Sequence, residues 1–186
     1  MVSPVNSAAK SISQALNPAV NTHKIRLAEP ADLPDIVAIY NQSIAGKAST
    51  ADLTPVTVAD RQAWFEEHLS QPNRPIYVVT NTEGVIMAWG SFSDVKNRIA
   101  YHISSEISIY VATQYQSLGL GRLLLQWMLT QAPQLGIQNI LALIFGHNKP
   151  SLALFEKFGF EPWGRFPKVC DMQSFTADLV ILGKAL

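Results

Sequence analysis

The succession of apolar and polar positions along most of the chain predicts one mixed α/β domain, with its elements in the order β-α-α-β-β-β-α-β-α-β-β. The segment Lys24–Ala28 is a short strand candidate. Ile36, Ile39 and Tyr40 then recur at the spacing of one helix face, and Asp32 is a candidate for the N-cap of that helix. This strand and helix open the predicted domain.

A second helix is predicted after a polar loop. It begins at Thr57, which starts the sequence Thr-Val-Ala-Asp, a weak capping-box pattern. Trp64, Phe65 and Leu69 form the apolar face of this helix. An apolar face of this kind packs against the core of a domain.

Three strands are predicted next. Pro75–Thr80 and Val85–Ser93 are joined by Asn-Thr-Glu-Gly, in which Gly84 tolerates the positive φ of a hairpin turn. A third strand is expected over Ile99–Val111, which alternates strictly toward its end. The alternation places two sets of side chains on opposite faces, namely Ile107, Ile109 and Val111 on one and Glu106, Ser108 and Tyr110 on the other.

The second half of the chain alternates helices and strands. Gly119–Gln131 is a predicted helix whose buried stripe consists of Leu120, Leu123, Leu124, Trp127 and Met128. A strand covered on both sides is expected at Ile140–Phe145, followed by a helix at Ser151–Phe158 that stops before Gly159. Two closing strands are expected at Phe160 and in the region Val180–Leu182.

Residues 1–23 differ from the rest of the chain. They are rich in Ser, Asn, Ala and Pro, and Lys10 carries their one charge. A secretory signal would need a continuous apolar core of about 7–15 residues, which this segment lacks. We expect a disordered extension, with a short helix around Lys10–Leu16 as the alternative, and a folded domain over residues 24–186.

Composition narrows the classes of function. Fourteen Lys and Arg residues balance fourteen Asp and Glu residues, whereas a nucleic-acid-binding module shows a basic excess or a basic stripe. No apolar run reaches the roughly 18 residues of a membrane span. We therefore expect a soluble, cytoplasmic protein with no nucleic-acid or membrane partner.

Cysteine and histidine content argues against a metal site. The single cysteine, Cys170, excludes an internal disulfide and a cysteine-rich cluster, and the four histidines form no helix-spaced pair. We expect no bound metal. Cys170 itself is predicted to be an unreactive thiol, because only Lys168 lies near it in the sequence as an activating base.

The most informative segment runs from Tyr110 to Arg122. It predicts a strand, a short loop with Gly119 and Gly121, and the start of an amphipathic helix. The first turn of a helix has unpaired backbone N–H groups and a partial positive charge, which together attract anions, and glycines allow a phosphate to approach the backbone. The pattern is neither a Walker loop nor a dinucleotide fingerprint. The residues alone leave two interpretations, a phosphate site with Arg122 beside it and a plain turn.

A family resemblance favours the phosphate site. Gln116-x-x-Gly119-x-Gly121 resembles the acyl-CoA signature of the GNAT N-acetyltransferases, and Asn148-x-x-Ser151-x-x-Leu154-Phe155-Glu156-x-x-Gly159-Phe160 resembles their second motif. Outside these motifs the sequence is similar to the phosphinothricin and methionine-sulfoximine acetyltransferase branch. This similarity includes Ala38–Asn41, Pro55–Thr57, Arg61-x-x-Trp64-Phe65, Ala100-Tyr101 and Glu106–Val111, and it runs from about Lys24 to the C-terminus.

The resemblance implies a fold and a cofactor site. The implied GNAT fold is an α/β structure with a central mixed, mostly antiparallel sheet, a splayed pair of strands and helices on both faces. The implied co-substrate is acetyl-CoA, and the implied contacts are Ile109, Tyr110, Val111, Gln116, Ser117, Leu118, Gly119, Leu120, Gly121, Arg122, Asn148 and Ser151. Asn148 and Ser151 could instead cap the helix that follows them. Resemblance and the low charge of 15% also suggest a homodimer.

Glu106 matches the catalytic glutamate of the family and is the predicted general base. Only a neutral amine can attack a thioester. A carboxylate of pKa about 4.3 and an ammonium of pKa about 8 are mismatched by about 4 units, or roughly 5 kcal/mol. Burial, a relaying water or deprotonation during attack must compensate for this difference. An exposed strand carboxylate without function is the alternative interpretation.

The resemblance also indicates the acceptor site. Trp89, Ser91, Phe92, Ser93 and Tyr101 match strand positions that face the acceptor in this branch, although Trp89 and Phe92 could equally be core residues. Three departures stand out. Phe155 replaces a tyrosine that protonates the leaving thiolate in many members, so water, Tyr110 or another group must do so, or the thiolate leaves unassisted. His102 replaces an arginine. The segment 170–178 retains only Asp178 of the branch pattern.

These observations predict an acetyl-CoA-dependent N-acetyltransferase that acts on the primary amine of a small amino-acid-like molecule of the phosphinothricin or methionine sulfoximine type. Two alternatives stay open at this point. One is acetylation of a protein or peptide amine, and the other is a non-catalytic module that binds acyl-CoA. Phe155 and the altered segment 170–177 favour the latter, whereas Glu106 and Asn148 argue against it.

Overall fold

The structure is a computed structural model that describes residues 23–186. The extension or short helix predicted before residue 23 lies outside the described residues. From Lys24 onward the helices and strands follow the predicted order.

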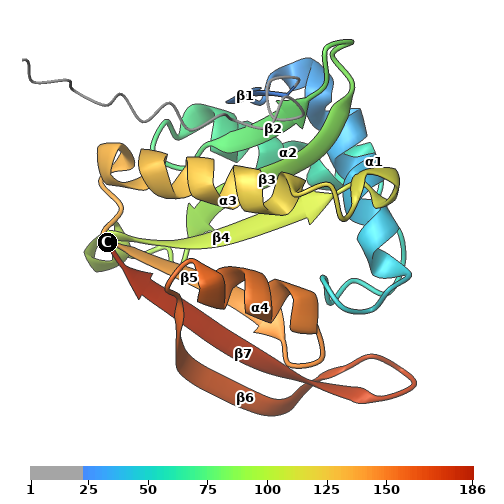
Figure 1. Ribbon diagram of the computed structural model, residues 1–186. Coiled ribbons are helices and arrows are strands. Elements are labelled where there is room, and N and C mark those ends of the chain that lie inside the picture. Colours follow the sequence, from blue (N-terminus) through green and yellow to red (C-terminus); the bar gives the residue numbers. More distant parts are fainter. Residues whose placement is uncertain (1–22) are drawn as a thin grey trace, which may run out of the picture.

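A seven-stranded sheet forms the centre of the molecule (Figure 1). Its strand order is β1-β2-β3-β4-β5-β7-β6, and every neighbouring pair is antiparallel except β4 and β5, which are parallel. The strands are β1 Lys24–Leu27, β2 Ile76–Thr80, β3 Ile86–Asp94, β4 Ser104–Val111, β5 Asn139–Phe145, β6 Glu161–Asp171 and β7 Thr176–Ala185. The expected mixed, mostly antiparallel sheet is confirmed.

Four α-helices cover the two faces of the sheet (Figure 1). They are α1 Leu33–Ile44, α2 Val58–Ser70, α3 Leu120–Gln131 and α4 Lys149–Lys157. Helices α1 and α2 pack on one face, and α3 and α4 pack on the other. Short 3-10 helices occur at Pro30–Asp32, Ile99–Tyr101, Thr113–Tyr115 and Ala132–Leu135.

Strand β4 separates two apolar cores, as its alternating sequence predicts. Ile107 is buried in the core under α3 and α4, and Ile109 and Val111 pack against it. Tyr110 packs against the core under α1 and α2. Successive side chains of a strand point to opposite faces, so the face that carries Glu106, Ser108 and Tyr110 is turned toward α1 and α2.

Strands β4 and β5 pair over only three residues each. The pairs are Ser104 with Asn139, Ser105 with Ile140 and Glu106 with Leu141. Beyond Glu106 the two strands diverge, although β4 continues to Val111 and β5 to Phe145. This is the splayed pair that the family resemblance predicts.

Three local expectations are corrected by the packing. The strand predicted from Ile99 begins only at Ser104, because residues 99–101 form a 3-10 turn. On α2, Leu69 is 43% exposed whereas His68 is buried. Asp32 stands at the start of α1 but makes no capping bond to that helix; its carboxylate instead accepts from the Glu29 N–H and pairs with Arg26.

The predicted stripe of α3 is shifted around the helix. Leu120, Leu124 and Met128 are buried as expected, and Leu125 joins them. Trp127 is 38% exposed and contacts the ring of Tyr77 edge-on at 6.5 Å. The buried face of the helix is therefore centred between the Leu124 and Leu125 positions. The 3.6-residue period alone does not decide which of several consecutive leucines is buried.

Candidate active site

Three cavities adjoin one another around β4. The splay cavity, about 310 Å³, lies between the diverging ends of β4 and β5 and includes Glu106, Ile144 and Phe155 in its lining. The acceptor cavity, about 200 Å³, lies between β3, β4 and the helices α1 and α2. The loop cavity, about 680 Å³, lies at the starts of α3 and α4. Tyr110 lines all three cavities.

Glu106 stands where the splay cavity and the acceptor cavity meet. Its side chain lines both, and its backbone forms the last pair between β4 and β5. Burial raises the pKa of this carboxyl above its ordinary value. This shift brings the pKa of the carboxyl closer to the pKa of an amine. The carboxylate is therefore better suited to accept a proton from an ammonium group than an exposed glutamate would be.

The floor of the acceptor cavity consists of three cross-strand pairs. Trp89 lies opposite Tyr110, Ser91 opposite Ser108, and Ser93 opposite Glu106. All six side chains line the cavity, because residues directly opposite in an antiparallel pair share one face of the sheet. The Trp89 and Tyr110 rings stack with centroids 4.6 Å apart. The floor is therefore aromatic at one end and polar at the end that carries Glu106.

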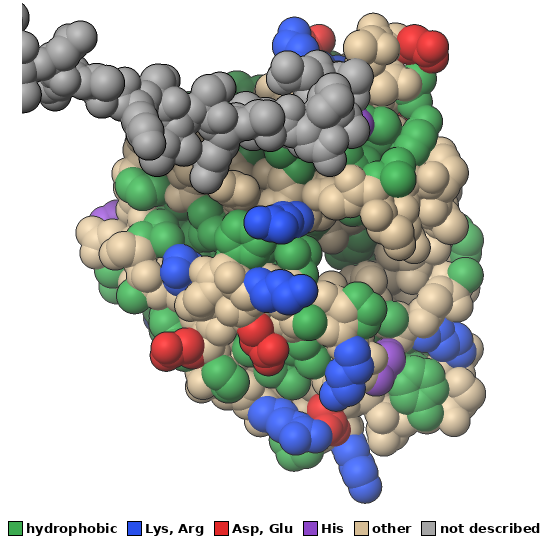
Figure 2. Space-filling view, viewed as in Figure 1, with side chains coloured by type: hydrophobic (Ala, Val, Ile, Leu, Met, Phe, Trp, Pro, Cys, Tyr) green, Lys and Arg blue, Asp and Glu red, His purple; other side chains and the backbone are tan. Residues whose placement is uncertain are grey.

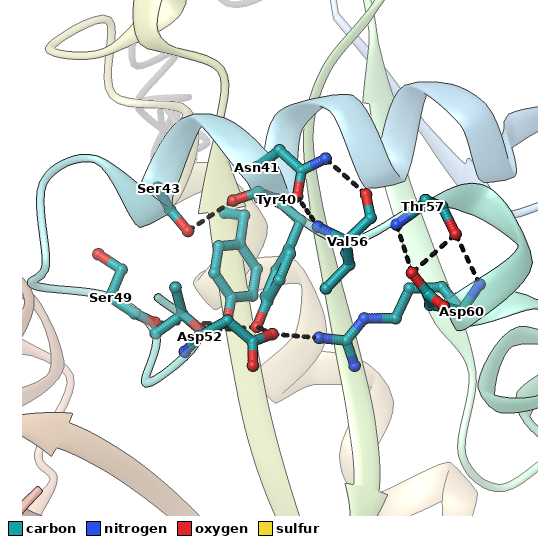
Figure 3. A network of polar contacts seen from close by, with 11 residues as sticks. Tyr40, Asn41, Ser43, Ser49, Asp52, Val56, Thr57 and Asp60 are labelled. Carbon is teal, nitrogen blue, oxygen red and sulfur yellow. Dashed lines mark hydrogen bonds and ion pairs between the residues drawn. The ribbon is translucent and has the colours of Figure 1, made fainter. Parts of the chain in front are cut away.

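The opposite wall comes from α1 and α2, and polar contacts join these helices to the loop between them (Figure 3). The hydroxyl of Tyr40 donates to Asp52 at 2.6 Å, and Arg61 Nη2 donates to the same carboxylate at 2.8 Å. The guanidinium carbon of Arg61 also lies 4.6 Å from the centre of the Tyr40 ring. This network fixes the guanidinium of Arg61, paired with Asp52, at the wall of the cavity.

The backbone of β4 offers N–H groups to the splay cavity. Ala112 N–H donates to Met87 of β3 at 2.9 Å. Because N–H directions alternate along a strand, the N–H groups of Val111 and Ile109 point away from β3. Beyond Glu106 no β5 residue pairs with β4 on that side. These groups are thus free to bind the amides or the carbonyl of a ligand in the cleft.

The loop before α3 has the geometry of an anion site. Ser117 and Gly119 have positive φ values of 62° and 80°, and Gly119 is the N-cap of α3. A turn of this kind and the start of a helix direct backbone N–H groups toward the same space. Gln116, Ser117, Gly119, Leu120, Gly121 and Arg122 all line the loop cavity. Figure 2 shows a hollow on this face, beside the N-terminal ends of α3 and α4.

Leu118 differs from the other predicted cofactor contacts. It is 63% exposed and lines none of the three cavities. Its side chain points outward because it lies between two residues of positive φ in a tight turn. Any contact of Leu118 with a cofactor would come from its backbone.

Asn148 and Ser151 line both the splay cavity and the loop cavity. The side-chain oxygen of Asn148 accepts from the Ser151 N–H at 3.2 Å, so the expected capping of α4 is present. Its Nδ2 donates to the backbone oxygen of Ala48 at 3.0 Å. Asn148 thereby connects α4 to the loop that follows α1.

The side chain of Phe155 has no proton to donate, so another group must protonate a leaving thiolate. Phe155 is buried, lines the splay cavity and the loop cavity, and packs edge-on against Phe160 at 4.9 Å. The tyrosine hydroxyls in the lining of these two cavities belong to Tyr110 and Tyr115. Burial raises the pKa of Tyr110 well above its ordinary value, so this hydroxyl keeps its proton at neutral pH.

Two predicted acceptor contacts are not at the acceptor cavity. Phe92 is fully buried in the core under α3 and α4, because its side chain points to the opposite face of β3 from Ser91 and Ser93. Tyr101 lies on the 3-10 turn, is 43% exposed and lines none of the three cavities. His102, on the same turn, is also absent from the cavity walls. Trp89, Ser91 and Ser93 are the predicted residues that the fold brings to this cavity.

Several lining residues were not singled out as site residues from the sequence. Tyr40, Arg61 and Trp64 belong to the wall of the acceptor cavity, although the helical spacing of Tyr40 and Trp64 predicts core positions. Cys170 lines the splay cavity. Residues 48–51 line it as well, but a short polar loop has no periodicity that would indicate this role.

Two features are absent from the described residues, a cluster of metal ligands and a membrane-spanning helix. Residues 23–186 contain no group of three or more His, Cys, Asp or Glu residues placed to hold a metal ion. Within the same range, no helix has the length and the apolar character to cross a membrane.

Comparison with known proteins gives close matches. The profile of the Acetyltransferase (GNAT) family matches residues 34–160. The Bacillus subtilis protein YwnH, whose name provisionally describes a phosphinothricin acetyltransferase, is 48% identical over 87% of this chain and 98% of its own. The L-methionine sulfoximine/L-methionine sulfone acetyltransferase of Pseudomonas aeruginosa is 35% identical over 78% of this chain and 84% of its own.

A solved structure shares the fold. The GNAT superfamily phosphinothricin acetyltransferase of Sinorhizobium meliloti, crystallised in complex with acetyl-CoA, superposes with a TM-score of 0.83. The match covers 89% of each chain at 27% sequence identity.

Proposed function

Since the chain belongs to the GNAT family of acetyltransferases, we propose that it transfers the acetyl group of acetyl-CoA to the primary amine of a small amino-acid-like molecule. The curated relatives named above act, by their names, on phosphinothricin or on methionine sulfoximine and sulfone. Compounds of this type are therefore the first candidates for the acceptor.

The observation that carries this proposal is the pair of opposite charges in one small cavity. Glu106 and Arg61 both line the acceptor cavity of about 200 Å³. A free amino acid has an amine and a carboxylate, so it can place its amine at Glu106 and its carboxylate at Arg61. Only one N–H of the guanidinium is used by Asp52, and an arginine has five N–H groups, so further donors are available to a carboxylate.

The cofactor occupies the other two cavities in this proposal. The N–H groups of residues 117–122 and the side chain of Arg122 hold the pyrophosphate at the start of α3. The pantetheine arm passes Asn148 and Ser151 and pairs with the backbone of Ile109 and Val111 in the splay. The thioester then lies beside Glu106, where the splay cavity meets the acceptor cavity.

The chemistry follows from this arrangement. Glu106 takes one proton from the ammonium, and the neutral nitrogen attacks the thioester carbonyl carbon. The N–H of Val111 stabilises the negative charge that develops on the carbonyl oxygen. The C–S bond then breaks, the nitrogen loses its second proton, and the thiolate of CoA gains one. This transfer runs through water or is relayed by Tyr110, which regains the proton that it gives, since Phe155 has none to give.

The experiment that tests the proposed function measures acetyl-CoA turnover as free thiol release. The acceptors are phosphinothricin, methionine sulfoximine, methionine sulfone, the free amino acids and a few amine-bearing peptides. Turnover on the first three is expected. Turnover on peptides alone would assign the acceptor to proteins. Tight binding of acetyl-CoA without turnover would favour a non-catalytic acyl-CoA module.

The protein is proposed to act as a homodimer. Large apolar side chains of the edge strand β6 are exposed to solvent, including Trp163 at 48%, Phe166 at 50% and Val169 at 54%. An exposed apolar edge strand is usually covered by a partner. Light scattering coupled to gel filtration should give twice the mass of one chain, and a monomer at micromolar concentration would contradict this assembly.

A further inference from the structure

His68 is a buried side chain that does not line the acceptor cavity but is hydrogen-bonded to a residue that does. It lies in the last turn of α2 and is 7% exposed. Its Nδ1 is 2.9 Å from the backbone oxygen of Trp64, and its Nε2 is 3.1 Å from Oγ of Ser93. Ser93 does line the cavity. His68 therefore connects α2 to the polar end of the cavity floor.

The two hydrogen bonds of His68 determine the direction of the Ser93 hydroxyl. In a neutral imidazole one ring nitrogen carries a hydrogen and the other accepts one. The Trp64 oxygen can only accept, so the neutral form of His68 carries its hydrogen on Nδ1, and its Nε2 accepts the hydroxyl hydrogen of Ser93. A serine hydroxyl has one hydrogen and two lone pairs. Toward the cavity, Ser93 is therefore an acceptor and has no hydrogen left to donate to Glu106.

Ser93 and Glu106 stand side by side at the place where the amine must bind. They are opposite each other in the β3–β4 ladder, and both line the acceptor cavity. The backbone of Ser93 is fixed from the other side, because the fully buried Ser105 donates its hydroxyl to the Ser93 oxygen at 2.8 Å. A carboxylate and a hydroxyl oxygen in adjacent positions complement a group that has at least two N–H bonds.

We propose that Ser93, oriented by His68, is a second acceptor for the amine of the substrate, and that His68 is a positioning residue for acetyl transfer. This inference rests on the proposed function. Two acceptors hold two N–H bonds of the ammonium and restrict rotation about its C–N bond. When Glu106 removes its proton, the Ser93 bond keeps the remaining amine in one orientation.

A double-mutant cycle on the full chain tests this inference. Its variants are Ser93→Ala, His68→Leu and the double substitution, with His68→Gln as the matched control that retains an acceptor atom for the Ser93 hydroxyl. The measured quantities are KM and kcat for the best acceptor of the wild-type protein, with the acetyl-CoA Kd and the melting temperature as tests of folding. Ser93→Ala is expected to raise the amine KM about tenfold, because it removes a hydrogen bond to a charged group.

The expected result is coupling. His68→Leu raises the amine KM about tenfold when Ser93 is present and leaves it unchanged in the Ser93→Ala background, while His68→Gln stays within about threefold of wild type. Equal factors in both backgrounds would show that His68 acts independently of Ser93 and would overturn the inference. An unchanged KM in Ser93→Ala would overturn it as well.

Nitrogen NMR gives a second, activity-independent readout. The His68 ring, assigned by its loss in His68→Gln, is expected as the Nδ1–H tautomer, and an Nε2–H tautomer would overturn the inference. A wild-type protein that acetylates no amine overturns the proposed function and this inference with it. An active wild-type protein without His68–Ser93 coupling overturns the inference alone.

Discussion

Glu106 and Leu141 are the last residues that pair across β4 and β5, and beyond them the two strands diverge. The carboxylate therefore lies at the entrance of the cleft, with the splay cavity on one side and the acceptor cavity on the other. One residue can thus reach an amine bound on one side and a thioester bound on the other.

Glu106→Gln is expected to lower kcat about 100-fold or more, because general-base catalysis contributes about 10²–10⁴-fold. The acetyl-CoA Kd should stay within about twofold of wild type, since the cofactor contacts lie on other residues. Steady-state kinetics and calorimetry measure the two quantities. Glu83→Gln, at an exposed turn residue, is the matched control. Equal loss of turnover and of acetyl-CoA binding would contradict the role of Glu106 as base.

The same substitution should raise the stability of the protein near neutral pH. Burial raises the pKa of Glu106 in the folded state, so the folded protein holds this proton more tightly than the unfolded chain. Below the ordinary pKa of about 4.3 the residue is protonated in both states. As the pH rises through the folded-state pKa, the wild type loses the stability that this proton provides.

Urea unfolding at pH 7 and at pH 4 measures this effect. We expect Glu106→Gln to be more stable than wild type at pH 7, and the difference to become small at pH 4. A difference of the same size at both pH values would mean that it arises from packing and not from the charge.

Arg122→Ala is expected to weaken acetyl-CoA binding about tenfold, because a charged hydrogen bond contributes about 1.5–3 kcal/mol and this exposed one is screened by water. The kcat at saturating acetyl-CoA should change little. Titration calorimetry at two salt concentrations should also show a weaker salt dependence in the variant. Lys24→Ala removes an exposed cation on the edge strand β1 and should leave Kd unchanged. A similar loss in both variants would indicate a long-range charge effect.

Arg61→Gln is expected to raise KM about tenfold or more for acceptors that have a carboxylate. The guanidinium lines the acceptor cavity, and a bidentate bond to a carboxylate is among the stronger polar contacts. The KM for acceptors that lack the carboxylate, such as the decarboxylated amine of methionine, should rise much less. Kinetics on the acid and on its decarboxylated analogue compare the two. An equal loss for both would assign Arg61 to the Tyr40–Asp52 network alone.

Periodicity predicted the elements well, for a physical reason. The face of β4 that carries Glu106, Ser108 and Tyr110 follows directly from the period of two, and the structure confirms it. The prediction that Phe92 faces the acceptor does not follow this period of two. It lies one residue from Ser91 and Ser93, so it points to the other face and into the core. An alternating strand cannot direct three consecutive side chains into one cavity.

The wall of the acceptor cavity is where sequence reasoning had least to work with. Tyr40 and Trp64 have the helical spacing of core residues, and they are partly buried, yet one side of each faces the cavity. Arg61 shows no periodicity, and its role depends on Asp52, nine residues away in a loop. Large apolar and aromatic side chains occur both in a core and in the wall of a cavity, so the amino-acid type alone does not distinguish the two locations.

The sequence by itself determined the order of elements, the faces of the strands and the glycine loop before α3, because these depend on local periodicity and local backbone freedom. The tertiary structure decided how far β4 and β5 pair, which side chains close the acceptor cavity and which nitrogen of His68 meets Ser93. These features arise from contacts between residues about 25 to 100 positions apart, such as His68 with Ser93 and Asn148 with Ala48. No local pattern encodes such contacts, since they form only when the sheet and its four helices pack together.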